Sequence, residues 1–193
     1  MKESILIAII CIFIYIYIYI HKNNYITVES NTGSAIKIYN DELNHEKTQL
    51  LSLVVDKMIL LRNYLNENKD SNELKDYKIY INQLVNNFTS DTDIHETDPN
   101  SDLTSYSVNK GEELSVCLKS KKTRKLHDIN LLMYVVIHEM SHFACPEIGH
   151  GELFQKIFRK FTNIAIKINL YNYDDYNQKP VEYCGMTLSS NVV

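Results

Sequence analysis

Residues 129–146 read INLLMYVVIHEMSHFACP, and this stretch decides the fold. Its residues are apolar on nearly every face of a helix, so we expect a central, buried helix. Asp128 is suited to cap the N-terminus of this helix, and Pro146 biases Cys145 away from helical backbone, which ends it. Burying two histidines and a glutamate in such a helix is costly without a partner, and a metal ion is the simplest one.

The motif His138-Glu139-Met140-Ser141-His142 has the form HExxH. Residues four apart on a helix share one face, so His138 and His142 can reach one zinc ion at about 2.0–2.1 Å. Glu139 is rotated from His138 by about 100° on the helix and is better placed to reach a zinc-bound water than the ion. The pattern therefore predicts hydrolysis of peptide bonds by a zinc-bound water, with Glu139 as general base.

A third ligand is needed, and His150 in Gly149-His150-Gly151 is the predicted one. It precedes a second helix whose apolar stripe begins at Phe154, so the chain can turn back toward the motif. Glu147 and Glu152 are the alternative ligands, and His127 is expected on the surface at the start of the motif helix. Three protein ligands leave the fourth position of one catalytic Zn²⁺ free for water.

The motif HEMSH, followed after seven residues by HGELF, resembles the WLM and SprT-like families of zinc metallopeptidases. TSYSVNKGEELSVCL and PVEYCGM, within 104–186, are similar to the WLM-like viral proteins encoded by large DNA viruses. The resemblance implies an α+β, zincin-like fold with the active-site helix packed on a small antiparallel sheet. It also implies His138, His142 and His150 as ligands, Glu139 as base, and a hairpin strand that binds substrate in extended form.

Tyr183 and Met186 lie in the segment PVEYCGM. In a catalytic interpretation Tyr183 hydrogen-bonds the developing oxyanion and Met186 lies beneath the metal in the pocket. The alternative, which we favour, is a turn packed on the core.

The run Ile5–Ile20 is uncharged and almost wholly apolar, which predicts an N-terminal transmembrane helix rather than a long buried strand. We therefore expect a membrane anchor at 1–22, a tether at 23–40 and a metallopeptidase-like domain at 41–193. The anchor implies a single-pass protein of a virion or host membrane, in contact with lipid through residues 5–20, whose orientation the flanking charges leave open. The sequon at Asn87 is usable only on the lumenal or external side.

The remaining chain predicts helices over 42–66 and 74–88, an acidic loop over 91–102 and a hairpin over 106–118. The net charge of -4 argues against coating of nucleic acid. The basic run Lys119–Lys125 is expected to be a solvated loop, with contact to phosphate or anionic lipid as the alternative.

Four cysteines, without a CxxC pair, do not make a disulfide framework, although a single disulfide among Cys117, Cys145 and Cys184 stays open. The expected partner is a protein or peptide substrate. The competing functional hypothesis is a catalytically inactive, zinc-containing module that binds peptides or proteins at a membrane.

Overall fold

The first helix, α1 (Lys2–Lys22), covers the apolar N-terminal run, which is therefore helical and not a strand. The computed structural model describes the backbone of residues 2–22 and 24–193 and the side chains of residues 6–16 and 24–193. Within this described part, no helix is both long enough and apolar enough to cross a membrane. The predicted membrane anchor over Ile5–Ile20 falls partly on side chains outside the described part, and the structure does not support it.

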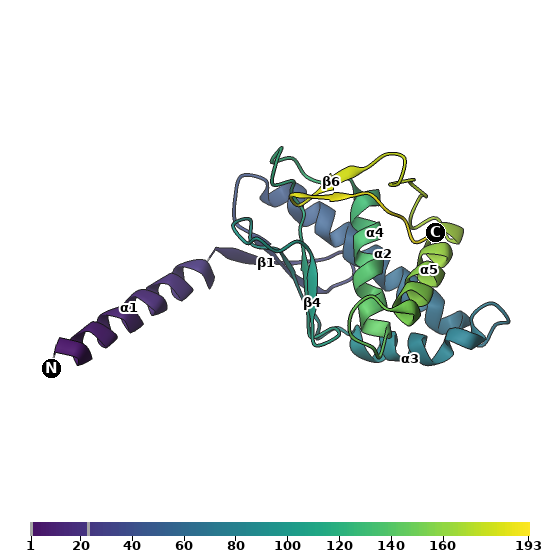
Figure 1. Ribbon diagram of the computed structural model, residues 1–193, viewed down its shortest axis with the longest axis horizontal. Coiled ribbons are helices and arrows are strands. Elements are labelled where there is room, and N and C mark those ends of the chain that lie inside the picture. The colour runs from purple at the N-terminus through teal and green to yellow at the C-terminus, as the bar shows by residue number, and fades with distance from the viewer. Residues whose placement is uncertain (1, 23) are drawn as a thin grey trace.

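A five-stranded sheet lies beside the remaining helices (Figure 1). Its strands follow the order β1-β2-β3-β5-β4, so β4 is an edge strand. Their bounds are β1 (Tyr25–Glu29), β2 (Ala35–Tyr39), β3 (Asp93–Glu96), β4 (Tyr106–Val108) and β5 (Glu113–Val116). The pairs β2–β3 and β3–β5 are parallel, so the prediction of a small antiparallel sheet is wrong for this sheet. Between β2 and β3 the chain crosses over through two helices, the kind of connection that parallel pairing requires.

Two segments differ from their predicted form. Residues 23–40, expected to be a tether, contain β1 and β2, because Ile36 and Ile38 are fully buried against the helices. The expected acidic loop contains β3, in which Ile94 is buried and Glu96 pairs with the fully buried ammonium of Lys47 at 2.9 Å. All three strands are short, and polar residues flank their few apolar positions, so the sequence carries little strand signal.

The helices agree with the sequence-based expectation. They are α2 (Asn44–Asn68), α3 (Lys78–Asn87) after the short 3-10 turn η1 (Lys75–Tyr77), α4 (Ile129–Ala144) and α5 (Glu152–Lys167). The motif helix α4 packs against α2, α3 and α5, and β4 lies beside it (Figure 1). Asp128 caps α4 by accepting a hydrogen bond from the backbone N–H of Asn130 at 2.8 Å, and α4 ends at Cys145, as predicted.

A two-stranded ribbon, β6 (Val181–Tyr183) and β7 (Met186–Leu188), follows α5. A disulfide between Cys117 and Cys184 joins its turn to the chain just after β5. His127, expected on the surface, is buried beside this disulfide. Within the basic run, Lys119 is buried and pairs with Asp41 at 2.7 Å, so the run is only partly a solvated loop.

Candidate metal centre

Three imidazoles converge at the C-terminal half of α4. The Nε2 atoms of His138 and His142, on one face of the helix, are 3.2 Å apart. The loop between α4 and α5 brings the Nε2 of His150 to 3.0 Å from that of His138 and 3.1 Å from that of His142. The structure thus brings together the three histidines that the sequence singled out, whereas neither Glu147 nor Glu152 belongs to the group.

The geometry and protonation of these imidazoles fit a zinc ion. Four ligands at about 2.0–2.1 Å in a tetrahedron are about 3.3 Å from one another, close to the observed spacing. Burial, reinforced by the neighbouring imidazoles, lowers the pKa of His138 to about 3. Burial, followed by the charges of His150 and Lys110, lowers the pKa of His142 to about 4. Both rings are therefore neutral at pH 7, which is the form that binds metal.

The ring of Phe154 packs against the imidazoles of all three histidines. Its fully buried side chain stacks on His142 at 4.3 Å between ring centroids and lies 4.9 Å from both His138 and His150. Packing against this aromatic ring fixes the orientation of the three imidazoles. The sequence placed Phe154 on the apolar stripe of α5, but nothing in the pattern indicated contact with every histidine of the group.

Glu139 lies beside the histidines and is nearly inaccessible to solvent. Burial raises the pKa of its carboxyl group to about 7, and a hydrogen bond from Ser107 opposes this shift. The hydroxyl of Ser107 on β4 donates this bond to Oε2 of Glu139 at 2.9 Å. Ser107 was not singled out from the sequence, because a serine on a strand carries no pattern of its own.

Tyr183 and Met186 reach the same site from the C-terminal ribbon. The hydroxyl of Tyr183 is hydrogen-bonded to that of Ser105, which also accepts the backbone N–H of Cys117 at 3.0 Å. Tyr183 is buried, and burial raises the pKa of its phenol. Met186 is half exposed at the rim.

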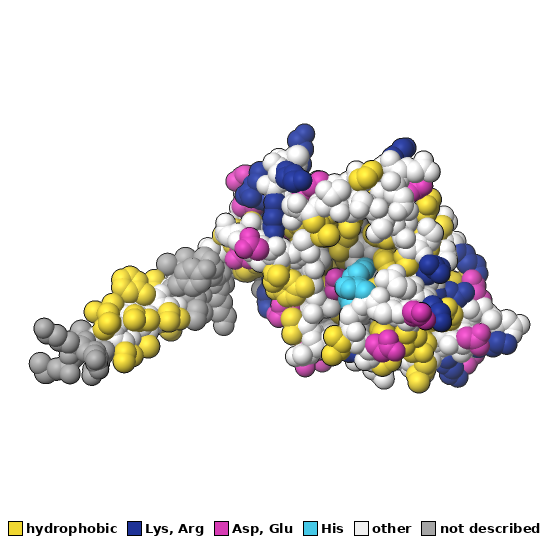
Figure 2. All heavy atoms as spheres, in the orientation of Figure 1, with side chains coloured by type: hydrophobic (Ala, Val, Ile, Leu, Met, Phe, Trp, Pro, Cys, Tyr) yellow, Lys and Arg dark blue, Asp and Glu magenta, His cyan; other side chains and the backbone are white. Residues whose placement is uncertain are grey.

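These groups share one cavity of about 720 Å³. Its walls are the edge strand β4, the motif helix, the loop at Ile148 and the ribbon with Tyr183 and Met186. Figure 2 shows histidine side chains in a hollow near the middle of this face, with hydrophobic side chains around them. Ile148 is 97% exposed at the mouth, so an apolar contact is available to a bound molecule.

No protein-family model matches this chain. It is 39% identical to uncharacterized protein R325 of Acanthamoeba polyphaga mimivirus over 162 residues, which cover 84% of this chain and 81% of that protein. The chain therefore belongs to the family of this mimivirus protein.

Two shorter matches are also viral. Uncharacterized protein 136R of Invertebrate iridescent virus 6 is 36% identical over 35% of this chain and 39% of its own length. Uncharacterized protein 042R of Invertebrate iridescent virus 3 is 34% identical over 37% of this chain and 44% of its own length. Among solved structures, Wss1 from Saccharomyces cerevisiae has a TM-score of 0.47 and 15% identity, over 69% of this chain and 88% of that one.

Proposed function

We propose that this protein is a zinc-dependent metallopeptidase. The observation that carries the proposal is the convergence of three imidazole nitrogens in a cavity whose wall also holds the buried carboxylate of Glu139. His138, His142 and His150 would hold the zinc ion. When bound, zinc supplies a Lewis acid and lowers the pKa of water in its open position.

Glu139 moves the proton. Its carboxylate accepts a proton from the attacking water and transfers it to the amine that leaves. A pKa raised by burial suits both steps, because the group must take up and release a proton near neutral pH. Ser107 holds the carboxylate in place through its hydrogen bond to Oε2.

The position of β4 at the edge of the sheet favours a peptide as the substrate. Residues 104–107 line the cavity, and an edge strand offers unpaired backbone groups with which an extended chain can pair. Tyr183 lines the same cavity and its hydroxyl bonds Ser105, the residue before β4. We assign its phenol to stabilisation of the developing oxyanion. The nature of the substrate, and the membrane location expected from the sequence, stay predictions.

The test compares Glu139→Gln with the wild-type protein in cleavage of a peptide library, read by mass spectrometry. Loss of proton transfer should lower turnover by about 10²–10⁴-fold. Zinc content, measured in the same samples, should stay at one ion per chain in the variant. Glu147→Gln is the matched control, because Glu147 lines the same cavity outside the histidine group.

Full activity in Glu139→Gln would contradict the proposed mechanism. Zinc and peptide binding without cleavage by the wild-type protein would instead favour the inactive binding module.

A further inference from the structure

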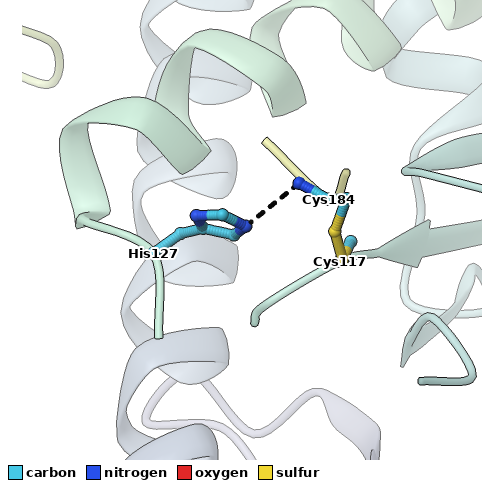
Figure 3. Close-up of side chains that lie close together, drawn as sticks. All are labelled: Cys117, His127 and Cys184. Carbon is cyan, nitrogen blue, oxygen red and sulfur yellow. Dashed lines mark hydrogen bonds between the residues drawn. A yellow bond between two sulfur atoms is a disulfide. The ribbon is translucent and has the colours of Figure 1, made fainter. Parts of the chain in front are cut away.

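Figure 3 shows a second group of potential metal ligands. It consists of Cys117 after β5, His127 before α4 and Cys184 in the turn of the ribbon. Their ligand atoms all lie within 4.8 Å of one another, and all three residues are buried. No residue is shared with the histidine cluster, so this group can be tested independently of the proposed peptidase.

The two cysteines are joined in a disulfide, with their Cα atoms 6.4 Å apart. Disulfides span Cα separations of about 4.4–6.8 Å, so this pair stands near the wide end of the range. Sulfurs that ligate one tetrahedral zinc ion at about 2.3 Å lie about 3.8 Å apart. The wide backbone separation leaves room for the sulfurs to move apart once their bond is broken.

His127 presents a nitrogen lone pair to this group. Its Nε2 accepts the backbone N–H of Cys184 at 3.3 Å, as the dashed line in Figure 3 marks, and a metal ion bound at Nε2 would replace this hydrogen bond. The ring also packs on Tyr183, with centroids 4.9 Å apart. Burial lowers the pKa of His127, although Glu182 opposes the shift, so the imidazole is neutral at pH 7.

We propose that reduction converts this cluster into a second metal site, in which the thiolates of Cys117 and Cys184 and Nε2 of His127 bind one Zn²⁺. A dithiol reductant supplies two electrons and two protons, which break the S–S bond and give two thiols, while the reductant itself becomes a disulfide. Zinc binding then releases the two thiol protons to solvent. Two sulfurs and one nitrogen are ligands that zinc prefers.

The surroundings offer access for the ion and for a fourth ligand. A hollow of about 450 Å³ lies beside the cluster, with His127, Ser120 and Glu182 in its lining. Oε1 of Glu182 already accepts the backbone N–H of Gly185 at 2.6 Å. Water from the hollow is therefore the fourth ligand that we assign.

The consequence is a ribbon that stays attached in both redox states. The disulfide ties the turn after Tyr183 to the end of β5 under oxidising conditions. A zinc ion between the same two sulfurs would keep this tie under reducing conditions. The part of the large cavity's wall that Tyr183 forms would then be preserved under both oxidising and reducing conditions.

Cobalt spectroscopy of the full chain tests the proposal, because only thiolate ligands give a sulfur-to-cobalt charge-transfer band. We expect the band in the reduced wild-type protein, together with one more metal ion per chain than in the oxidised protein. The variants Cys117→Ser and Cys184→Ser should lose the band and the additional ion. Cys11→Ser and Cys145→Ser are the matched controls, since each removes a cysteine outside the disulfide.

His127→Ala separates the metal site from the disulfide, because the imidazole takes no part in the S–S bond. Its oxidised form should keep the disulfide but melt below the oxidised wild type, because a buried ring is lost. Its reduced form should bind cobalt at this site at least about tenfold more weakly. This variant still tests the proposal if the cysteine variants do not fold. Absence of the band in reduced wild-type protein, or a band unaffected by His127→Ala, overturns the proposal and leaves a purely structural disulfide. Either result leaves metal binding at the three histidines unchanged.

Discussion

The ammonium nitrogen of Lys110 lies 2.5 Å from the carbonyl oxygen of Cys145, at the point where α4 ends and the loop to His150 begins. The same ammonium donates to the carbonyl oxygens of Pro146 at 2.6 Å and Glu147 at 3.4 Å. One side chain in the turn of the β4–β5 hairpin thus holds three successive carbonyl groups of the loop that delivers the third imidazole.

The turn itself is fixed in place. Asn109 and Lys110 have φ angles of 47° and 57°, a left-handed conformation that is uncommon outside glycine. A Cβ at Gly111 would come within 2.3 Å of the carbonyl oxygen of Asn87, so only glycine allows the turn to pack on the end of α3. The side chain of Asn87 also donates to the carbonyl oxygen of Phe143 on α4 at 2.8 Å. The loop to His150 is therefore tied to a rigid neighbour.

Lys110→Met should weaken zinc binding. Two effects oppose each other, because the ammonium both orders the loop and, through its charge near His142, disfavours a cation. We expect the loss of order to dominate and zinc affinity to fall by about tenfold, as for other changes that disturb ligand positioning. Competition with a chromogenic chelator measures this change. Tighter zinc binding in Lys110→Met would show that charge dominates.

Lys121→Met is the control for this prediction. Lys121 likewise holds carbonyl groups, those of Ser101 at 2.5 Å and Leu103 at 2.8 Å, but on a loop that carries no candidate ligand. Its zinc affinity should equal that of the wild-type protein.

His150→Ala should lose most of the zinc from the histidine site, while Glu147→Ala should keep it. Among the side chains that the structure describes, His150 alone joins the motif histidines, with its Nε2 3.0–3.1 Å from theirs. Elemental mass spectrometry of the oxidised proteins after dialysis against zinc gives the stoichiometry. Equal zinc in both variants would mean that the third ligand is a different residue.

The histidine group was predictable because its spacing is encoded locally. His138 and His142 are fixed by helical periodicity, and the glycines around His150 indicated a turn back toward the motif. The hairpin of β4 and β5 was predictable for the same reason, since apolar residues alternate on both sides of Asn109-Lys110-Gly111.

Other features depend on contacts between distant segments. Ser107 contacts Glu139 across 32 positions of the chain, and the disulfide joins cysteines 67 positions apart. A single sequence does not encode such pairs in a periodic pattern. The strand β3 was not predicted because a glutamate such as Glu96 is typical of an exposed loop. In the structure, Lys47 on another element is its buried ion-pair partner.

Phe154→Leu should weaken zinc binding more than it destabilises the fold. Leucine preserves most of the buried volume, so the free energy of unfolding should fall by about 1–2 kcal/mol. The flat face that supports three imidazoles is lost, and zinc affinity should drop at least about tenfold. Denaturant unfolding of the metal-free protein and chelator competition measure the two effects separately.

Phe161→Leu is the matched variant, because Phe161 is also fully buried on α5 but makes no ring contact with the histidines. Its free energy of unfolding should fall by about as much as that of Phe154→Leu, and its zinc affinity should not change. An equal loss of affinity in both variants would trace the effect to general loosening of α5.

The carboxyl group of Asp41 makes the stability of the fold depend on pH under acidic conditions. Burial raises the pKa of Asp41, but hydrogen bonds from Lys119 and the backbone of Leu43, with Lys47 nearby, outweigh it and lower the pKa to about 2. A carboxyl group with a depressed folded-state pKa stabilises the fold above its unfolded value of about 3.9, and this contribution is lost as pH falls toward 2. Because Asp41 is partly solvated, we expect the contribution to be about 1 kcal/mol.

Asp41→Asn should therefore lower the free energy of unfolding at pH 7 and flatten its decline between about pH 4 and pH 2. Urea unfolding at a series of pH values measures both quantities. Asp93→Asn is the control, because Asp93 pairs with Lys37 at an exposed position where an ion pair contributes little. Stability curves of Asp41→Asn and wild-type protein that run parallel through this range would mean that the contacts of Asp41 do not favour its charged form.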